Sequence, residues 1–282
     1  AGGRARPERA SRRARGRATN SANLAALHTE LADRFGPMRA VEGLAFLAKD
    51  DSHANLVTLG SGLNSPHLSL TGVAKSPTPG YEWAAALAAL VALYGNIDPA
   101  RPFQTLQLRG VLPPAESDRF TREERNLLLF GGISTTTADA DGTVRCERLI
   151  TTYQKNGFGA DDTAYLDVPT LLTLGYLRYD FVNAFLLQFP RHKLADDGVR
   201  FGAGQAVMTP KTGRAFAVSK FRQWEALGLV ENIEQFKQDL VVERDAQNPN
   251  RLNFLLPPDL VNQLMVTAVQ IGFRLSTPAG VS

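Results

Sequence analysis

The chain has 282 residues, of which 44% are hydrophobic and 21% charged, and this composition is typical of a globular protein with a substantial core. No run approaches the roughly 18 apolar residues of a membrane-spanning helix, and the single cysteine excludes an intrachain disulfide. The formal net charge of +3 is uneven, because residues 1–20 hold seven arginines and one glutamate, whereas the rest holds 24 basic and 27 acidic side chains.

Residues 1–20 consist mainly of Arg, Gly, Ala and Ser and contain no large apolar side chain. Such a segment cannot contribute to a core, so we expect a disordered Arg-rich tail. One functional hypothesis is that this tail binds nucleic acid or an anionic surface in a salt-dependent way. Because the chain starts at Ala1 without a methionine, we also expect it to be an N-terminally incomplete piece of a longer protein.

Residues 21–154 alternate between helical and strand-like patterns. A first helix carries the apolar series Leu24, Leu27, Leu31 and Phe35. Strand, helix, strand and helix then follow at the spacing of a right-handed βαβα unit with a parallel strand pair. The four expected elements are residues 41–48, 50–63, 67–73 and 77–94, with Gly95 as the stop of the last helix.

A Pro-rich connection over residues 96–114 follows and contains one short predicted strand, 105–108. Thr121 and Glu124 have the spacing of a capping box, which predicts a helix that closes at Gly131-Gly132. Residues 133–138 and 143–153 then form an expected hairpin around Asp141-Gly142, since Asp-Gly is a strong hairpin turn signal.

The second half of the chain reads as two helices followed by a small sheet. We expect helices over 167–189 and 209–228, a brief turn or helix over 232–237, and strands over 240–244 and 252–256. The fold class is therefore α/β plus α+β, in which a βαβα domain (residues 21–154) precedes a helix-backed small C-terminal sheet (residues 155–282).

Near the end of the chain, an alternating series over residues 265–275 predicts a long strand. Its first half is apolar on both faces and its second half on one, so we expect burial on two faces and then on one. Strands 240–244 and 252–256 are the local candidates for its sheet. An exposed apolar strand is an aggregation hazard for a monomer, and this one makes sense as a strand shared with another subunit.

Residues with catalytic potential do not form a recognisable set. The four histidines lack metal-ligand spacing, and no G-x-S-x-G motif occurs. Gly60 and Gly62 follow a helix rather than a strand, which favours helix capping over phosphate binding. Lys75–Thr78 precedes a helix and is the one feature that supports the runner-up hypothesis, an α/β nucleotide- or phosphate-binding enzyme domain. We expect no catalytic, cofactor-binding or metal-binding residues.

The helix over 209–228 interleaves aromatic and basic residues. Phe216, Phe221 and Trp224 fall on one face, which predicts core packing rather than a nucleic-acid stacking platform. We expect Lys220 and Arg222 to point away from that face.

Several long motifs, in order, resemble contractile-phage tail sheath proteins of the Mu-like type over residues 21–275. They are KSPTPGYEWAAALAALVA (75–92), DPARPFQTLQLRGVLPP (98–114), FTREERNLLL (120–129), RLITTYQKNGFGADDTAYLDV (148–168), FPRHKLADDG (189–198) and VERDAQNPNRLNFLLPPDLVNQLMVTAVQIGFRL (242–275). The resemblance covers the C-terminal part of such a protein, and residues 1–20 do not share it.

The resemblance implies a structural subunit and not an enzyme, with no cofactor and no small-molecule substrate. Such subunits stack as six-fold rings in a helical sheath around the tail tube protein, with baseplate and tail terminator proteins at the ends. Their terminal arms add strands to the sheets of neighbouring subunits, and contraction drives the tube during DNA or effector delivery. The expected location is the virion tail, assembled in the host bacterial cytoplasm. We expect Val269, Ile271, Phe273 and Leu275 to form the inter-subunit contact.

Overall fold

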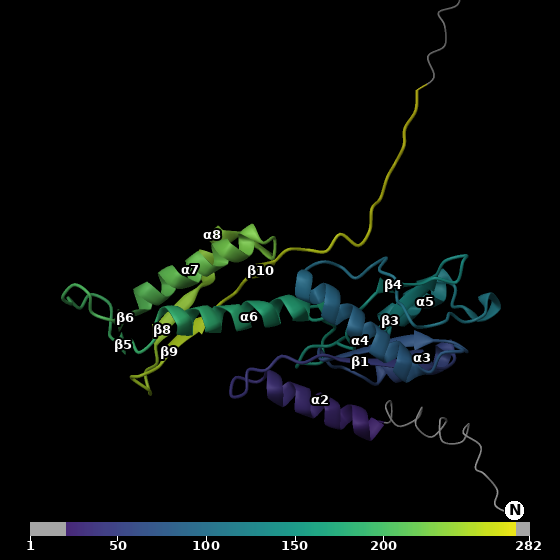
Figure 1. Ribbon diagram of the computed structural model, residues 1–282, viewed down its shortest axis with the longest axis horizontal. Coiled ribbons are helices and arrows are strands. Elements are labelled where there is room, and N and C mark those ends of the chain that lie inside the picture. The colour runs from purple at the N-terminus through teal and green to yellow at the C-terminus, as the bar shows by residue number, and fades with distance from the viewer. Residues whose placement is uncertain (1–20, 275–282) are drawn as a thin grey trace, which may run out of the picture.

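The computed structural model describes residues 21–274, and in it a four-stranded sheet and a helical lobe are joined by one long helix, α6 (Figure 1). The Arg-rich residues 1–20 and Leu275 lie outside the described residues. The elements of the first part are α2 (Ser21–Phe35), β1 (Ala45–Asp50), α3 (His53–Ser61), β2 (Leu68–Val73), α4 (Gly80–Ile97), a 3₁₀ turn (Glu116–Asp118), α5 (Arg122–Phe130), β3 (Ile133–Ala138) and β4 (Val144–Arg148).

The sheet has the order β1-β2-β3-β4, with β1, β2 and β3 parallel and β4 antiparallel to β3. Helix α4 packs against one face, where it covers Phe46 and Val73. Helices α3 and α5 pack against the other face, where Leu70 and Ile133 lie in a second core cluster. Side chains therefore alternate between two apolar layers, as strands buried on both faces require.

The predicted βαβα unit and the helix cap at Thr121 are confirmed. Thr121 Oγ1 accepts a hydrogen bond from Glu124 N, and the Glu124 carboxylate accepts one from Thr121 N at 2.8 Å. The strand predicted over 105–108 is present only as one bridge, between Gln107 and Arg145, with backbone hydrogen bonds from Thr105 N to Cys146 O and from Leu108 N to Val144 O. It does not continue as a regular strand, since Thr105 has a φ of 70° and leaves the extended region.

Two element boundaries also differ from the sequence prediction. The strand expected over 41–48 begins at Ala45 and ends at Asp50. Helix α4 passes through Gly95 and ends at Ile97. Gly95 is not a cap but a place of close packing, where a Cβ would lie 3.1 Å from Leu172 Cδ1 of α6.

The second part of the chain forms a lobe of helices and short strand pairs. Its elements are α6 (Val168–Gln188), β5 (Lys193–Leu194), β6 (Val207–Met208), α7 (Pro210–Ala226), β7 (Val230–Glu231), α8 (Ile233–Asp239), β8 (Val241–Arg244), β9 (Leu252–Leu255) and β10 (Asp259–Leu260). The short strands form three pairs: β5 with β6, β7 with β10, and β8 with β9. The expected small sheet backed by helices is the β8–β9 ribbon, against which α7 packs.

Aromatic side chains form the core of this lobe. Phe181 of α6 contacts Phe216 and Phe254 edge-on, with ring centroids 5.2 and 5.1 Å apart, and Phe221 stacks on Phe236 at 4.3 Å. Helix α6 reaches both cores, because Val168 is buried under the sheet and Phe181 in the lobe. The predicted core role of the aromatic residues of α7 is confirmed.

Lys220 differs from the prediction, because it is buried instead of pointing away. Its side chain is 9% exposed, and Nζ lies 2.6 Å from the Asp180 carboxylate on α6. Trp224 Nε1 donates a hydrogen bond to the same carboxylate at 2.6 Å. The acid on the neighbouring helix compensates the buried charge, and a single-helix pattern cannot show it. Arg222 is exposed, as expected.

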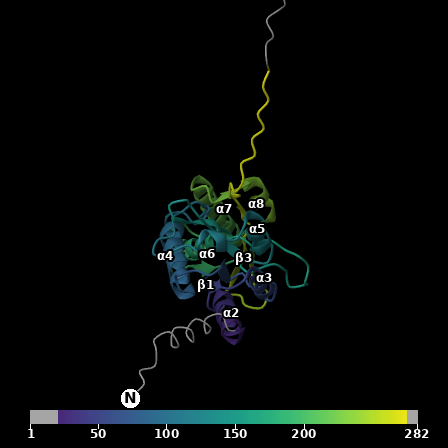
Figure 2. The ribbon, with the colours of Figure 1, turned by 90° about the vertical axis from the view of Figure 1, so that its right-hand side faces the viewer.

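The long terminal strand predicted over 265–275 is wrong for the described part. Residues 265–274 belong to no strand and extend away from the body (Figures 1 and 2). The expected partners, β8 and β9, pair with each other, and after Pro257-Pro258 the chain turns to β7 through β10. The terminal segment therefore reaches no sheet of its own chain.

Candidate assembly surfaces

The C-terminal segment is anchored at its start and leaves the body there. Asp259 and Leu260 pair with β7, and Val261 N donates a hydrogen bond to Leu229 O at 3.2 Å. Within the described chain, no residue after Val261 makes a hydrogen bond to the body. An extended backbone with unpaired N–H and C=O groups is a template for strand addition.

The side chains of this segment are apolar and face solvent. Exposure is 77% for Val269, 86% for Ile271 and 81% for Phe273. Because successive side chains of an extended chain point to opposite sides, these three share one side. The structure thus presents three of the four predicted contact residues together, and the fourth, Leu275, lies outside the described residues. The predicted burial of the first half is wrong, since Leu264 and Val266 are 78% and 81% exposed.

An apolar groove of about 760 Å³ runs beside β9. Every residue of 251–254 lines it and no residue of β8 does, so it follows the β9 edge that β8 leaves open. Its other lining residues include Leu177, Phe181 and Val182 of α6, Trp224 of α7, and Phe35 and Pro37 at the end of α2. An open strand edge beside an apolar trough has the features that an added strand requires.

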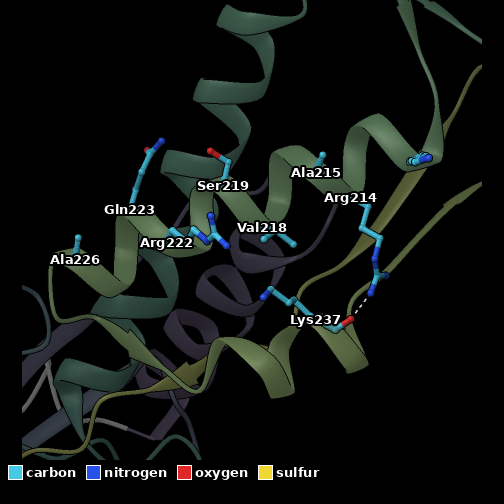
Figure 3. A pocket seen from close by; sticks show the side chains of 9 residues that line it. Arg214, Ala215, Val218, Ser219, Arg222, Gln223, Ala226 and Lys237 are labelled. Atoms are coloured by element: carbon cyan, nitrogen blue, oxygen red, sulfur yellow. Dashed lines mark hydrogen bonds between the residues drawn. The ribbon is translucent and has the colours of Figure 1, made fainter.

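A second hollow, of about 820 Å³, lies between α7 and α8 (Figure 3). Four basic side chains line it, Lys211, Arg214 and Arg222 of α7 and Lys237 of α8, together with Ala215, Val218, Ser219, Gln223 and Ala226 of α7. Arg214 is fixed by hydrogen bonds to the carbonyls of Lys237 and Leu240. A basic, shallow surface of this kind is complementary to an acidic partner. The helical spacing of its residues on α7 was visible in the sequence.

The predicted helix-capping role is confirmed for Gly62, the C-cap of α3, and is wrong for Gly60, which lies buried inside that helix. The alternative phosphate site at Lys75–Thr78 is occupied by internal contacts. Lys75 Nζ lies 2.6 Å from Asp118 Oδ1, and this hydrogen bond raises the pKa of Lys75. Thr78 Oγ1 accepts a hydrogen bond from Leu112 N at 2.9 Å, and Ser76 Oγ accepts one from Trp83 Nε1. These contacts tie Lys75, Ser76 and Thr78 into the protein's own packing.

Other ionisable groups have structural roles. Burial lowers the pKa of His67, and the charge of His28 lowers it further. Burial raises the pKa of the Cys146 thiol to about 12, which makes it unreactive near neutral pH. Residues 21–274 contain no group of three or more His, Cys, Asp or Glu side chains that could hold a metal ion. None of the helices in that range has the length and apolar character to cross a membrane.

Comparisons with known proteins give a consistent result. The family model of the phage tail sheath protein central domain matches residues 15–152, and that of the phage tail sheath C-terminal domain matches residues 160–274. A curated relative, the Mu-like prophage FluMu tail sheath protein of Haemophilus influenzae, is 46% identical over 257 residues. The match covers 91% of this chain and 53% of the relative, so the chain spans about half the length of that protein.

Solved structures share the fold at low sequence identity. The sheath tail protein from Desulfitobacterium hafniense aligns with a TM-score of 0.56 at 15% identity, over 87% of this chain and 52% of that one. The helical sheath of the anti-feeding prophage in its contracted state aligns with a TM-score of 0.52 at 15% identity, over 91% and 67%. A chain of the anti-feeding prophage baseplate aligns with a TM-score of 0.57 at 13% identity, over 91% and 66%.

Proposed function

The chain belongs to the phage tail sheath protein family, and we propose that it is a subunit of a contractile sheath that polymerises by exchanging its C-terminal segment. The observation that carries this proposal is that one chain, in the part that the structure describes, has both an extended segment without a partner strand and a strand edge without a neighbour. One is the extended apolar segment over 264–274, and the other is the open β9 edge with its apolar groove.

In this arrangement, the segment of one subunit lies along β9 of the next and converts the β8–β9 ribbon into a three-stranded sheet. Backbone hydrogen bonds supply affinity, and Val269, Ile271 and Phe273 enter the groove. Burial of each such side chain is worth about 1.5–3 kcal/mol. Leu275, two residues further on, continues the same side of the segment.

The contact propagates because donor and acceptor are different surfaces. The segment leaves the body at β10, whereas the acceptor groove lies between β9 and α6. A head-to-tail contact of this kind generates rings or helical tubes. It is compatible with the six-fold stacked rings that we propose for the sheath in the virion tail, assembled in the host bacterial cytoplasm.

The basic surface between α7 and α8 supports a contact with an acidic partner. We assign this partner to the tail tube protein, with baseplate and tail terminator proteins at the sheath ends.

The two-domain division near residues 154–160 stays a prediction. The nucleotide-binding enzyme alternative is not supported, since the relatives are sheath proteins and Lys75 is paired with Asp118. We propose that the chain catalyses no reaction.

Ile271→Asp tests the segment exchange. The loss of one buried side chain and the desolvation of a carboxylate lower the association constant at least about tenfold. Sedimentation velocity and negative-stain electron microscopy over a concentration series measure assembly, and far-UV circular dichroism verifies the fold. Gln270→Asp is the matched control, because it adds the same charge on the opposite side of the segment. Equal assembly of Ile271→Asp and the parent chain would rule out the exchange.

A further inference from the structure

The parallel strands β2 and β3 separate before they end. They pair only at Leu70 with Ile133 and at Thr71 with Ser134. Beyond this point, β2 continues to Val73 paired with β1 only, and β3 continues to Ala138 paired with β4 only. A register irregularity at Thr135/Thr136 marks the place where β3 turns away. The divergence opens a crevice at the carboxyl ends of the two strands.

This crevice is a small cavity of about 200 Å³. Two of its sides are the strand ends, residues 72–74 and 136–138. The remaining walls combine apolar side chains with two guanidinium groups. The apolar part is Trp83, Pro113, Pro114, Phe120 and Val144, and the charged part is Arg119 and Arg125.

The two arginines retain free donors. Arg125 is held by hydrogen bonds from Nε to Glu147 at 2.7 Å and from Nη1 to Phe120 O at 2.8 Å, which leaves Nη2 without a partner in the described chain. Arg119 donates only from Nε, to Pro114 O at 3.2 Å. Its two η nitrogens make no hydrogen bond or ion pair to the described residues. The adjacent Asp118 is engaged by Lys75.

We propose that this crevice binds a small organic anion, with its carboxylate or phosphate group on Arg119 and Arg125 and its apolar body against Trp83 and Phe120. Arginine forms bidentate hydrogen bonds with such groups. The cavity is smaller than the roughly 300–1,000 Å³ of sites for drug-sized ligands, so a nucleotide does not fit. The anion is either a free molecule or a carboxylate of a neighbouring copy, and the second source rests on the proposed assembly.

Benzoate and benzamide form a matched pair of probes, since they share a ring and differ in charge. Isothermal titration calorimetry on the monomeric chain should give benzoate binding and no benzamide binding. Arg119→Gln should weaken benzoate binding at least about tenfold, because it removes a charge-assisted pair. Arg109→Gln, the same change at an exposed position outside the cavity, should leave binding unchanged.

Absence of benzoate binding at millimolar concentration would overturn the proposal, as would equal binding of benzamide or equal effects of the two variants. These measurements do not require assembly, so their failure is distinct from a failure of segment exchange. Sedimentation of the assembling chain then identifies the source. Benzoate inhibits assembly if a neighbour's carboxylate occupies the crevice and has no effect on assembly if the anion is free.

Discussion

Removal of the buried charge on α7 tests how the C-terminal lobe is held together. Lys220→Met keeps most of the side-chain stem but removes the ammonium group that lies 2.6 Å from Asp180. The Asp180 carboxylate then keeps the hydrogen bond from Trp224 Nε1 as its remaining compensation from α7. The substitution therefore leaves a partly buried carboxylate without its cation, at the contact between α6 and α7.

The magnitude follows from the exposure of the two partners. Loss of one member of a fully buried ion pair costs roughly 3–5 kcal/mol. Lys220 is 9% exposed but Asp180 is 27% exposed, so water solvates part of the remaining charge. We expect the free energy of unfolding to fall by about 2–3 kcal/mol, which lowers the Tm by roughly 4–12 °C in a protein of this size.

Differential scanning calorimetry and urea unfolding measure this loss. The double substitution Lys220→Met with Asp180→Asn removes the unpaired charge and keeps an acceptor for Trp224, so it should cost less than Lys220→Met alone. Lys237→Met is the surface control, because its partner Glu234 is 77% exposed, and it should cost less than about 1 kcal/mol. A loss for Lys220→Met no larger than that of the control would refute the argument, as would a double variant less stable than the single one.

Two further predictions concern the sheet half of the chain. Gly60→Ala places a Cβ 2.0 Å from Gly131 O and should lower the free energy of unfolding by about 1–3 kcal/mol or more. Gly62→Ala is the control, because its Cβ makes only ordinary van der Waals contacts, and it should leave the free energy of unfolding nearly unchanged. Urea titration of both variants measures the difference. Burial lowers the pKa of His67, so on acidification the unfolded chain takes up a proton on this imidazole before the folded chain does. The contribution of neutral His67 to the free energy of unfolding is therefore fully present above pH ~6.5 and decreases as the pH drops toward 5. His67→Phe should flatten this slope in Tm measurements at pH 7, 6 and 5, and an unchanged slope would contradict the assignment.

Local patterns predicted most secondary structure because their physical causes are local. The capping box at Thr121, the Asp141-Gly142 hairpin and the apolar face of α7 each depend on residues within one or two turns. The order of helices and strands also predicted the parallel β1–β2 pair, since such crossovers have a strong handedness. The same local rules failed at Thr105, which has a φ of 70° and leaves the extended region.

The candidate site could be predicted only in part. The alternation of Val269, Ile271 and Phe273 showed that the segment is extended and apolar on one side, and the family likeness pointed to another subunit. The groove beside β9 was not predictable, because the end of α2, α6, Trp224 of α7 and residues 251–258 form it together, and only tertiary packing brings these separate elements side by side.

The sequence was sufficient for the order of the main helices and strands, the fold class and the apolar character of the terminal segment, because periodicity, caps and turns act over a few residues. Which elements find partners depends on the tertiary structure. It placed Lys220 against Asp180, separated β2 from β3, and sent the chain after Pro258 to β7 instead of β8 and β9. Those outcomes depend on the packing of distant segments, and they leave an apolar segment and an open strand edge on the same molecule.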